Sequence, residues 1–341
     1  MNSAATPATP AFPPTPELVT FGEAMLRLSP PPLTRLEHAR RFDAWVGGAE
    51  LNVAVAAARL GVTTRWVSRL TDNALGRAIA NRAGDQGVDV SCVEWTQGDR
   101  VGLYFVELGD GPRAVDVTYD RAGSAMARIT PGTIDWRRAF DGAKWFHAGG
   151  ITAALSESAA ATLAEALGAA KDAGLEVSYD LNYRAKLWSA ERARAVQEPL
   201  LCHVDVLIAG DDTARLIFDV AGSAEAAARE LRERYELQTV ALTLRDRSRG
   251  ATVHWAALVC TDARAHCSPT LPVRVDDPIG AGDAFAAGLI CGRLRGADWE
   301  TAAGYGVALA SLKHQTPGDF SQASLEDVER VLKGAVPTET R

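Results

Sequence analysis

The sequence predicts an α/β protein with a doubly wound, mostly parallel sheet and a small β-sheet lid. The main sheet is predicted because β-prone runs alternate with helical runs along most of the 341 residues, a pattern typical of parallel sheets. The lid is predicted because two β-rich runs, 101–108 and 113–119, interrupt that alternation. They are joined by Gly109-Asp110-Gly111-Pro112, a sequence typical of the turn in an antiparallel hairpin.

The N-terminal half is expected to contribute the start of the main sheet and the whole lid. In order, we expect strands at 17–21, 26–28 and 42–46, a helix at 49–60, a strand at 65–70, a helix at 74–86 and a strand at 89–95. The first helix is alanine-rich and closes on Gly61, a common C-terminal signal. We expect the hairpin to pair with the strands near 20–28 and 42–47, so that the lid covers about 22–47 and 100–122.

The C-terminal half resumes the alternation. In order, we expect a strand at 144–147, a helix at 156–173, a strand at 176–179, a helix at 189–201, a strand at 206–208, helices at 211–219 and 223–235, a strand at 239–244, an edge hairpin at 252–259, a strand at 271–275, and helices at 284–294, 298–314 and 322–333. Since no linker divides the series, residues 17–335 are predicted to form one domain. Residues 1–16 contain five prolines and are expected to be a disordered tail.

Composition excludes several classes of partner. The net charge is −7 and no dense Lys/Arg run is present, so neither nucleic acid nor an acidic membrane surface is an expected partner. No apolar stretch approaches the roughly 18 residues of a membrane span. The five cysteines are scattered and lack metal-site spacing, which indicates reduced thiols and a cytoplasmic protein.

The stretch from Asp276 to Leu289 carries the strongest chemical signal. A strand-like run leads into Gly280-Ala281-Gly282-Asp283, and an apolar helical run follows at once. Small residues let the backbone approach a ligand closely, and the amides at a helix N-terminus attract anions. Asp283 would then be an ionised carboxylate beside an anion site, suited to accept a proton from an attacking hydroxyl. The simpler interpretation is that Asp283 only caps the helix.

The whole pattern D-x-x-G-A-G-D-A-F-x-x-G resembles the C-terminal signature of the ribokinase-like (PfkB) carbohydrate kinases. This resemblance implies ATP and Mg²⁺ as cofactors. It also implies that the amides of Gly280, Ala281 and Gly282 stabilise the transferring phosphoryl group, with Gly280 and Gly282 contacting ATP. Asp283 would be the catalytic base and would also bind the substrate.

A second motif, Gly47-Gly48-Ala49-Glu50-Leu51-Asn52-Val53-Ala54, lies between a strand and a helix. Alone, the glycine pair could be no more than a tight connection. Together with the downstream signature it is similar to the N-terminal signature of the same kinases, in which Gly47, Gly48 and Asn52 would face the sugar hydroxyls. Its form is closer to 2-keto-3-deoxygluconate kinases than to ribokinases.

The arms of the predicted hairpin carry Tyr104, Tyr119 and Arg121. One interpretation makes the tyrosines cross-strand aromatics and Arg121 a surface charge. The resemblance to 2-keto-3-deoxygluconate kinases implies instead that the Arg121 guanidinium pairs with a substrate carboxylate, with the phenol hydroxyls beside it.

Two further elements match the same kinases. Asp180-Leu181-Asn182-Tyr183-Arg184 follows a strand and resembles an element that lies near the phosphates. It implies that Asn182 and Arg184 bind ATP and that Arg184 also reaches the substrate, although a plain salt bridge between Arg184 and Asp180 is an alternative. Asp319, in Pro317-Gly318-Asp319, would meet substrate hydroxyls, although this tripeptide is also ordinary turn chemistry.

The chain departs from the family in two places. Many relatives carry Asn-x-x-Glu, tied to magnesium and phosphate, where this chain has Gly210-Asp211-Asp212-Thr213. Either Asp211 or Asp212 takes that role through water, or this element does not contact the metal, so the metal ligands are left open. The nucleotide loop is altered to the sequence at 244–251, which keeps one family glycine, Gly250, and contains three arginines. The resemblance implies that Arg245 and Gly250 contact ATP.

The sequence therefore predicts ATP-dependent phosphorylation of 2-keto-3-deoxygluconate, or of a close sugar acid, at the C6 hydroxyl. Its partners would be the small-molecule sugar acid and ATP, and we expect a homo-oligomer that uses the exposed lid sheet. One alternative is a neutral-sugar kinase such as a fructokinase. Another is a sugar-binding regulator of the same fold that has lost catalysis.

Overall fold

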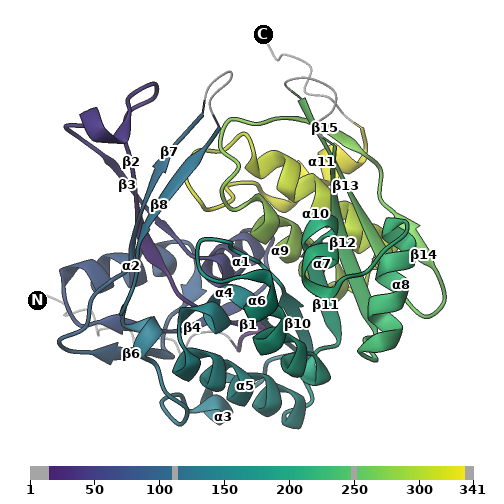
Figure 1. The fold of residues 1–341 in the computed structure, drawn as a ribbon, viewed down its shortest axis with the longest axis horizontal. Coiled ribbons are helices and arrows are strands. Elements are labelled where there is room, and N and C mark those ends of the chain that lie inside the picture. Colours follow the sequence, from purple (N-terminus) through teal and green to yellow (C-terminus); the bar gives the residue numbers. More distant parts are fainter. Residues whose placement is uncertain (1–14, 110–113, 247–251, 335–341) are drawn as a thin grey trace, which may run out of the picture.

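A long sheet runs through the protein, with helices packed on both of its faces (Figure 1). The computed structural model describes residues 15–109, 114–246 and 252–334. The main sheet has the order β14-β13-β12-β11-β10-β9-β1-β4-β5, with β6 paired to β4 and β15 to β13. Its strands are β1 (Leu18–Phe21), β4 (Thr64–Thr71), β5 (Val88–Asp89), β6 (Val93–Thr96), β9 (Trp145–Gly149), β10 (Glu176–Asp180), β11 (Val206–Gly210), β12 (Thr239–Asp246), β13 (Thr252–Cys260), β14 (Ala265–Cys267) and β15 (Leu271–Arg274).

The strands from β12 to β5 pair in parallel, and in the part of the main sheet that the structure describes the antiparallel strands are β13, β14 and β15, at one edge. The helices are α1 (Ala49–Arg59), α2 (Ala74–Asp85), α3 (Trp136–Ala139), α4 (Gly150–Leu155), α5 (Glu157–Asp172), α6 (Ala190–Gln197), α7 (Asp211–Phe218), α8 (Ala224–Arg234), α9 (Ala281–Leu294), α10 (Trp299–Lys313) and α11 (Leu325–Leu332). Helices α3 to α8 pack apolar side chains against one face of the sheet. Helices α1, α9 and α10 form a second core on the other face. The prediction of a doubly wound α/β fold is confirmed.

The lid is a separate sheet with the order β3-β2-β7-β8. Its strands are β2 (Met25–Ser29), β3 (Asp43–Gly47), β7 (Leu103–Glu107) and β8 (Asp116–Asp120). Strands β2 and β7 pair in parallel, and the other two pairs are antiparallel. The predicted lid is therefore present, built from the hairpin and the two early strands. In Figure 1 the lid stands at the left, β12 and β13 stand at the right, and α9 lies between them.

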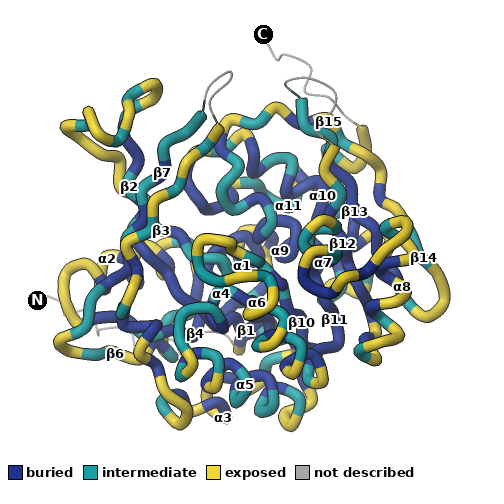
Figure 2. Tube along the Cα trace, in the orientation of Figure 1, coloured by how far each residue is buried: buried dark blue, intermediate teal, exposed yellow. Residues whose placement is uncertain are grey.

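Burial follows the layers. Figure 2 shows the central strands and α9 in the buried class, while the outer helices and the lid edges are exposed. Helix α9 is mostly apolar and lies between the sheet and α10, and eleven of its fourteen residues are buried. The carboxyl ends of the parallel strands meet the N-terminus of this largely buried helix at the edge of the sheet where open α/β sheets bind ligands.

Some predicted boundaries were wrong for local reasons. The run at 89–95 is two short strands, because the Asp89 carboxylate accepts a hydrogen bond from the Ser91 amide at 2.8 Å and turns the chain. The short helices α3 and α4 were missed. Helix α9 begins at Ala281, not at Ala284, and its N-cap is Gly280. The interpretation of Asp283 as a helix cap is therefore wrong, since Asp283 lies inside the first turn.

Three predictions fall wholly or mostly outside the described residues: the tail at 1–16, of which only Thr15 and Pro16 are described, the hairpin turn at 110–113 and the segment 247–251 of the nucleotide loop. Among the described helices, none is long and apolar enough to cross a membrane.

Candidate active site

A cavity of about 1020 Å³ lies between the lid and the carboxyl edge of the main sheet. It is lined by side chains or backbone from β2, β3, β7, β8, β11, β12, β13, α1, α9, the first turn of α7 and the loop after β10. The predicted site residues that line it are Gly47, Gly48, Asn52, Tyr104, Tyr119, Arg121, Asn182, Arg184, Arg245, Gly280, Gly282, Asp283 and Asp319. Ala281 is buried beneath the turn, and Gly250 lies outside the described residues. The structure therefore brings together residues that are widely separated in the sequence.

The turn before α9 requires glycine at position 280. Gly280 has a φ of 86°, and a Cβ atom there would lie 2.2 Å from the backbone oxygen of Asp319. The carboxylate of Asp277 supports the turn, because its Oδ1 accepts a hydrogen bond from the Ile279 amide at 3.1 Å. Gly282 is different. Among the described residues, and apart from its chain neighbours and the backbone of its own helix, the nearest atom to a Cβ built there is the Arg245 Nη2, at 3.9 Å, and Gly282 lines the cavity.

Asp283 lies in the first turn of α9 and is 8% exposed. Its Oδ2 accepts a 2.6 Å hydrogen bond from Nδ2 of Asn52. Burial raises the pKa of Asp283 to about 7, although the Asn52 hydrogen bond acts in the opposite direction. A carboxyl group that titrates near neutral pH can exist as the ionised base and still accept a proton readily.

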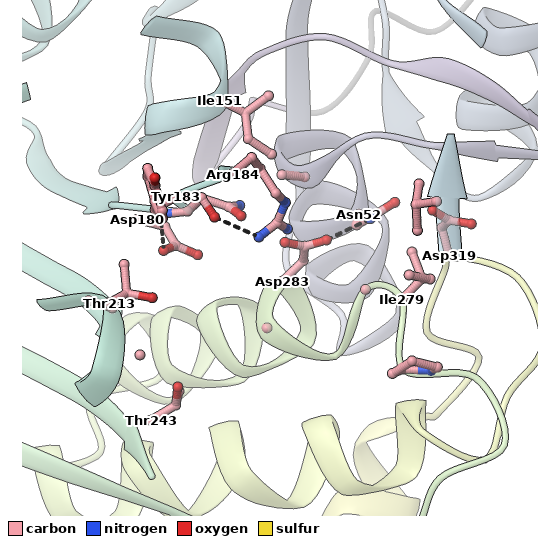
Figure 3. A pocket seen from close by; sticks show the side chains of 18 of the residues that line it. Asn52, Ile151, Asp180, Tyr183, Arg184, Thr213, Thr243, Ile279, Asp283 and Asp319 are labelled. Atoms are coloured by element: carbon pink, nitrogen blue, oxygen red, sulfur yellow. Dashed lines mark hydrogen bonds between the residues drawn. The ribbon is translucent and has the colours of Figure 1, made fainter. Parts of the chain in front are cut away.

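The loop after β10 lies across the cavity from α9. Burial raises the pKa of Asp180 to about 6, and its Oδ1 accepts a hydrogen bond from the Asn182 amide at 3.0 Å. Figure 3 shows the Arg184 guanidinium directed toward Asp283, with a hydrogen bond to the Tyr183 carbonyl oxygen. The charge of Arg184 lowers the pKa of Asp180 against the effect of burial, but no ion pair between the two is found within the described residues, so the alternative of a plain salt bridge is not borne out. The guanidinium is available to an anion near Asp283.

The lid side of the cavity carries aromatic and acidic groups. The rings of Tyr104 and Tyr119 stack with centroids 6.0 Å apart. The Tyr104 hydroxyl donates to Oδ1 of Asp319, and burial is the main cause of a strongly raised pKa for Tyr104. A Cβ atom at Gly47 would lie 2.2 Å from both partners of this hydrogen bond. Glycine at 47 therefore allows the lid hydroxyl and the Asp319 carboxylate to meet.

Arg121 is 7% exposed, so the interpretation of it as a surface charge is wrong. Its Nε donates to Oε2 of Glu23 at 2.8 Å, and its Nη2 donates to the same oxygen. The guanidinium carbon also lies 5.5 Å from the centroid of the Tyr119 ring. Both Arg121 and Glu23 line the cavity. The guanidinium therefore faces the site with its charge already paired, and the sequence analysis had not assigned this role to Glu23.

The nucleotide side of the cavity lies beside α7 and β12. The Arg245 guanidinium stacks over the Trp255 ring at 4.5 Å and lines the cavity. Asp211 pairs with Arg215 at 2.9 Å, but its other oxygen is buried without a partner in the described structure. No cluster of three or more metal-ligating side chains is found among the described residues.

Sequence reasoning also missed three buried charged residues around the site. Arg27 is 1% exposed, Glu50 is 1% exposed and Lys313 is fully buried. Each belongs to an element whose apolar residues dominate the pattern, so periodicity alone does not reveal their partners. The only available signal was a charged residue at a position that should face the interior.

Over residues 15–325 the chain matches the pattern of the pfkB family carbohydrate kinases. The chain belongs to this family. It is therefore a carbohydrate kinase, and the predicted family and enzyme class are confirmed.

Individual relatives agree with this assignment. A 2-dehydro-3-deoxygalactonokinase of Haloferax volcanii is 40% identical over 320 residues, which cover 94% of this chain and 98% of the relative. A 2-dehydro-3-deoxygluconokinase of Thermoproteus tenax is 32% identical, covering 93% of this chain and 94% of the relative. The crystal structure of a 2-dehydro-3-deoxygluconokinase of Thermotoga maritima superposes with a TM-score of 0.89 at 38% identity, covering 94% of this chain and 98% of the other.

Proposed function

We propose that this kinase transfers the γ-phosphoryl group of ATP to the C6 hydroxyl of 2-keto-3-deoxygluconate or of a close sugar acid. The observation that carries the proposal is the composition of one cavity. The same cavity is lined by a buried carboxylate at the N-terminus of α9, Asp283, and by a buried guanidinium on the lid, Arg121.

In the proposed reaction, Asp283 accepts the proton of the sugar hydroxyl as the oxygen attacks the γ-phosphorus. A new P–O bond forms, the bond between the β- and γ-phosphates breaks, and ADP leaves with that oxygen. The turn at 280–282 borders the space beside Gly282, and in the proposal the amides of Gly280 and Gly282 stabilise the equatorial oxygens there. The Ala281 amide instead donates to the Pro278 carbonyl oxygen at 3.4 Å. Arg184 and Arg245 line the same space and add positive charge where negative charge develops.

Magnesium fits the acidic groups on the nucleotide side. Mg²⁺ binds oxygen ligands, keeps several waters and is usually held by one or two carboxylates together with the phosphates. The Asp211 oxygen that lacks a partner lies at this side, and Asp180 and Asp212 line the same cavity. Mg²⁺ bound there would neutralise charge on the β- and γ-phosphates.

Two observations support a sugar acid as the substrate. The lid end of the cavity provides the Arg121 guanidinium, which lies over the Tyr119 ring and is the group suited to a carboxylate. In addition, the similar proteins of Haloferax volcanii and Thermoproteus tenax are named for 2-dehydro-3-deoxy sugar acids of the galacto and gluco series. These two names differ in one stereocentre, so either configuration is a candidate for this chain.

A neutral-sugar kinase is the second candidate, because Glu23 already pairs with Arg121 and reduces the charge available to a carboxylate. A coupled ADP-release assay on a panel of keto-deoxy acids, aldonates and neutral sugars separates the two. We expect a kcat/KM for at least one keto-deoxy acid that exceeds every neutral sugar by about 10²-fold or more, the value of one enclosed charge pair. A phosphorus NMR spectrum of the product then identifies the phosphorylated carbon. Faster turnover of fructose than of any acid would replace the proposal with the second candidate.

A further inference from the structure

Arg27 is a buried cation that joins the lid to the phosphate-binding side of the site. It lies on β2, in the lid, and its side chain is 1% exposed. Its Nη2 lies 2.9 Å from Oδ2 of Asp277, and its Nη1 lies 3.1 Å from Oδ2 of Asp319. Its Nε donates to the Ser29 hydroxyl at 2.9 Å. All three nitrogens of the guanidinium therefore have partners, and two of these partners are carboxylates on different loops.

Asp277, one of the two carboxylates that pair with Arg27, also accepts hydrogen bonds from the backbone of two loops. Its Oδ1 accepts from the Ile279 amide at 3.1 Å, and its Oδ2 accepts from the Gly318 amide at 3.0 Å. The carboxylate thus ties the loop that leads into the turn at 280–282 to the loop that carries Asp319. Because Arg27 holds the same carboxylate, the lid, the turn and the second loop meet at one guanidinium.

Lys313 completes the network beneath the turn. A Cβ atom at Gly280 would lie 3.3 Å from Cε of Lys313, and the ammonium donates to the Thr316 carbonyl oxygen at 2.9 Å. Arg27 pairs with both buried carboxylates, Asp277 and Asp319, and the buried Lys313 ammonium adds a second positive charge near them. Buried charges are tolerated when they are paired in this way.

We propose that Arg27 is a positioning residue for phosphoryl transfer, which holds the Gly280–Gly282 turn and the Asp319 carboxylate in register with the lid. Arg27 does not line the cavity, so it acts through Asp277 and Asp319 and touches neither substrate. The inference rests on the proposed phosphoryl transfer but not on the identity of the sugar. The test therefore uses whichever sugar the wild-type protein phosphorylates fastest.

The test compares Arg27→Met with Arg27→Lys and with a control. Arg65→Met is the matched control, because Arg65 is also a buried arginine, paired with Asp89 at 2.7 Å on β4, away from the cavity. For Arg27→Met we expect kcat to fall by about 10²-fold, the effect of a displacement of roughly 1 Å at a reacting centre. The KM for ATP should change less than about threefold, because the substitution disturbs contacts that matter in the transition state and leaves the residues that bind ATP in the ground state in place. Arg65→Met should lower Tm without changing kcat.

Two additional measurements separate positioning from simple burial of charge. Arg27→Met combined with Asp277→Asn removes one cation and one carboxylate, so it should regain Tm while kcat stays low. Amide hydrogen exchange at Ile279 and Gly318 should quicken in Arg27→Met, and this readout does not depend on any kinase activity. If Arg27→Met is too unstable to purify, Arg27→Lys keeps the charge and can hold only one carboxylate, so its kcat should still fall.

The result that overturns the proposal is a kcat within about threefold of wild type in Arg27→Met, with a loss of Tm like that of Arg65→Met. Recovery of both Tm and kcat in Arg27→Met combined with Asp277→Asn also overturns the proposal. Such recovery would mean that Arg27 only neutralises the buried Asp277 carboxylate and does not position the turn. If the wild-type protein phosphorylates no sugar, the proposed function fails. Separately, if amide hydrogen exchange at Ile279 and Gly318 is unchanged in Arg27→Met, then Arg27 does not hold the two loops and the positioning proposal is refuted.

Discussion

The Asn52 side chain donates a 2.6 Å hydrogen bond to the carboxylate of Asp283, and this bond joins α1 to the first turn of α9. The other end of the Asn52 amide accepts from the Gly48 amide at 3.3 Å, which orients the side chain. The two family signatures, one at each end of the chain, thus meet in one hydrogen bond. Since a donor stabilises the ionised carboxylate, Asn52 keeps the pKa of Asp283 lower than burial alone would make it.

Asn52→Leu should move the acid limb of the pH–rate profile to higher pH. Asp283 must be ionised to act as the base, and its pKa is about 7, so wild-type kcat/KM should fall as the pH drops below that value. Without the hydrogen bond the pKa of Asp283 rises further, so the variant loses rate at pH 7 and regains part of it at higher pH. An acid limb at the same pH in both proteins would show that the bond does not govern the base.

Glu50→Gln should stabilise the protein, and more so at alkaline pH. Glu50 is fully enclosed, neither carboxyl oxygen has a partner within the described structure, and burial raises its pKa to about 8. The folded state therefore holds a proton that the unfolded chain releases above its ordinary pKa of about 4.3. The contribution of the protonated Glu50 to the free energy of unfolding is therefore fully present below the unfolded pKa of about 4.3. It is lost as the pH rises toward the folded-state pKa of about 8.

The glutamine variant cannot lose this stability, because it does not ionise. Its gain in free energy of unfolding over wild type should grow by a few kcal/mol, on the order of 1.4 kcal/mol per pH unit, between pH 5 and 8. Urea unfolding at several pH values measures the difference. Glu94→Gln, at an exposed position on β6, is the control and should show no such trend. A constant difference across this range would contradict the assignment of Glu50 as a neutral buried acid.

Gly282→Val should abolish activity with little loss of stability. Apart from the chain around Gly282 itself, the nearest described atom to a Cβ built there is the Arg245 Nη2 at 3.9 Å, so the new side chain would occupy the site proposed for the transferring phosphoryl group. We expect kcat to fall by about 10²-fold or more, as when an anion-stabilising group is removed, and the free energy of unfolding to change by about 1 kcal/mol, as for valine in place of a helical glycine. Gly84→Val, on α2 with nothing within 4 Å, is the matched control for that change. Normal turnover in Gly282→Val would place the phosphoryl group elsewhere.

Arg121→Ala should discriminate between acidic and neutral substrates. Breaking an enclosed charge pair costs about 2–5 kcal/mol, or about 30- to several-thousand-fold in kcat/KM for a sugar acid. A neutral sugar of similar length should be affected little. Because the variant leaves Glu23 buried and unpaired, Arg121→Ala combined with Glu23→Gln is the stability-matched version. Equal losses on both kinds of substrate in that double variant would mean that Arg121 supports the lid and does not bind a carboxylate.

The parts of the site that could be predicted are those carried by short, contiguous stretches. The turn at 280–282 and Asp283 were predicted together because strand, glycines, acid and helix follow one another in the sequence. The contact between Tyr104 and Asp319 joins residues 215 positions apart, and that between Arg27 and Asp319 joins residues 292 apart. Such contacts depend on how the lid seats on the main sheet, and no local pattern encodes that arrangement.

Arg121 shows the other limit of sequence reasoning. Its presence on the hairpin was visible, but its partner Glu23 follows β1, a strand of a different sheet. The lid was predicted because alternating runs and a glycine-rich turn specify a hairpin locally. Which charged groups face each other across the lid is decided by tertiary packing. The predicted homo-oligomer through the exposed lid likewise remains a prediction.

The central claim is that Asp283 is the base for phosphoryl transfer, and the most direct test is the kcat of Asp283→Asn. This substitution keeps the shape of the side chain and the Asn52 contact can persist through the amide oxygen, but the group can no longer accept the proton. With the sugar acid that wild type uses best, kcat should fall by about 10²–10⁴-fold, while ATP affinity, measured by calorimetry, stays close to wild type. Retention of more than about a tenth of wild-type kcat, below the usual contribution of a positioned base, would contradict the account.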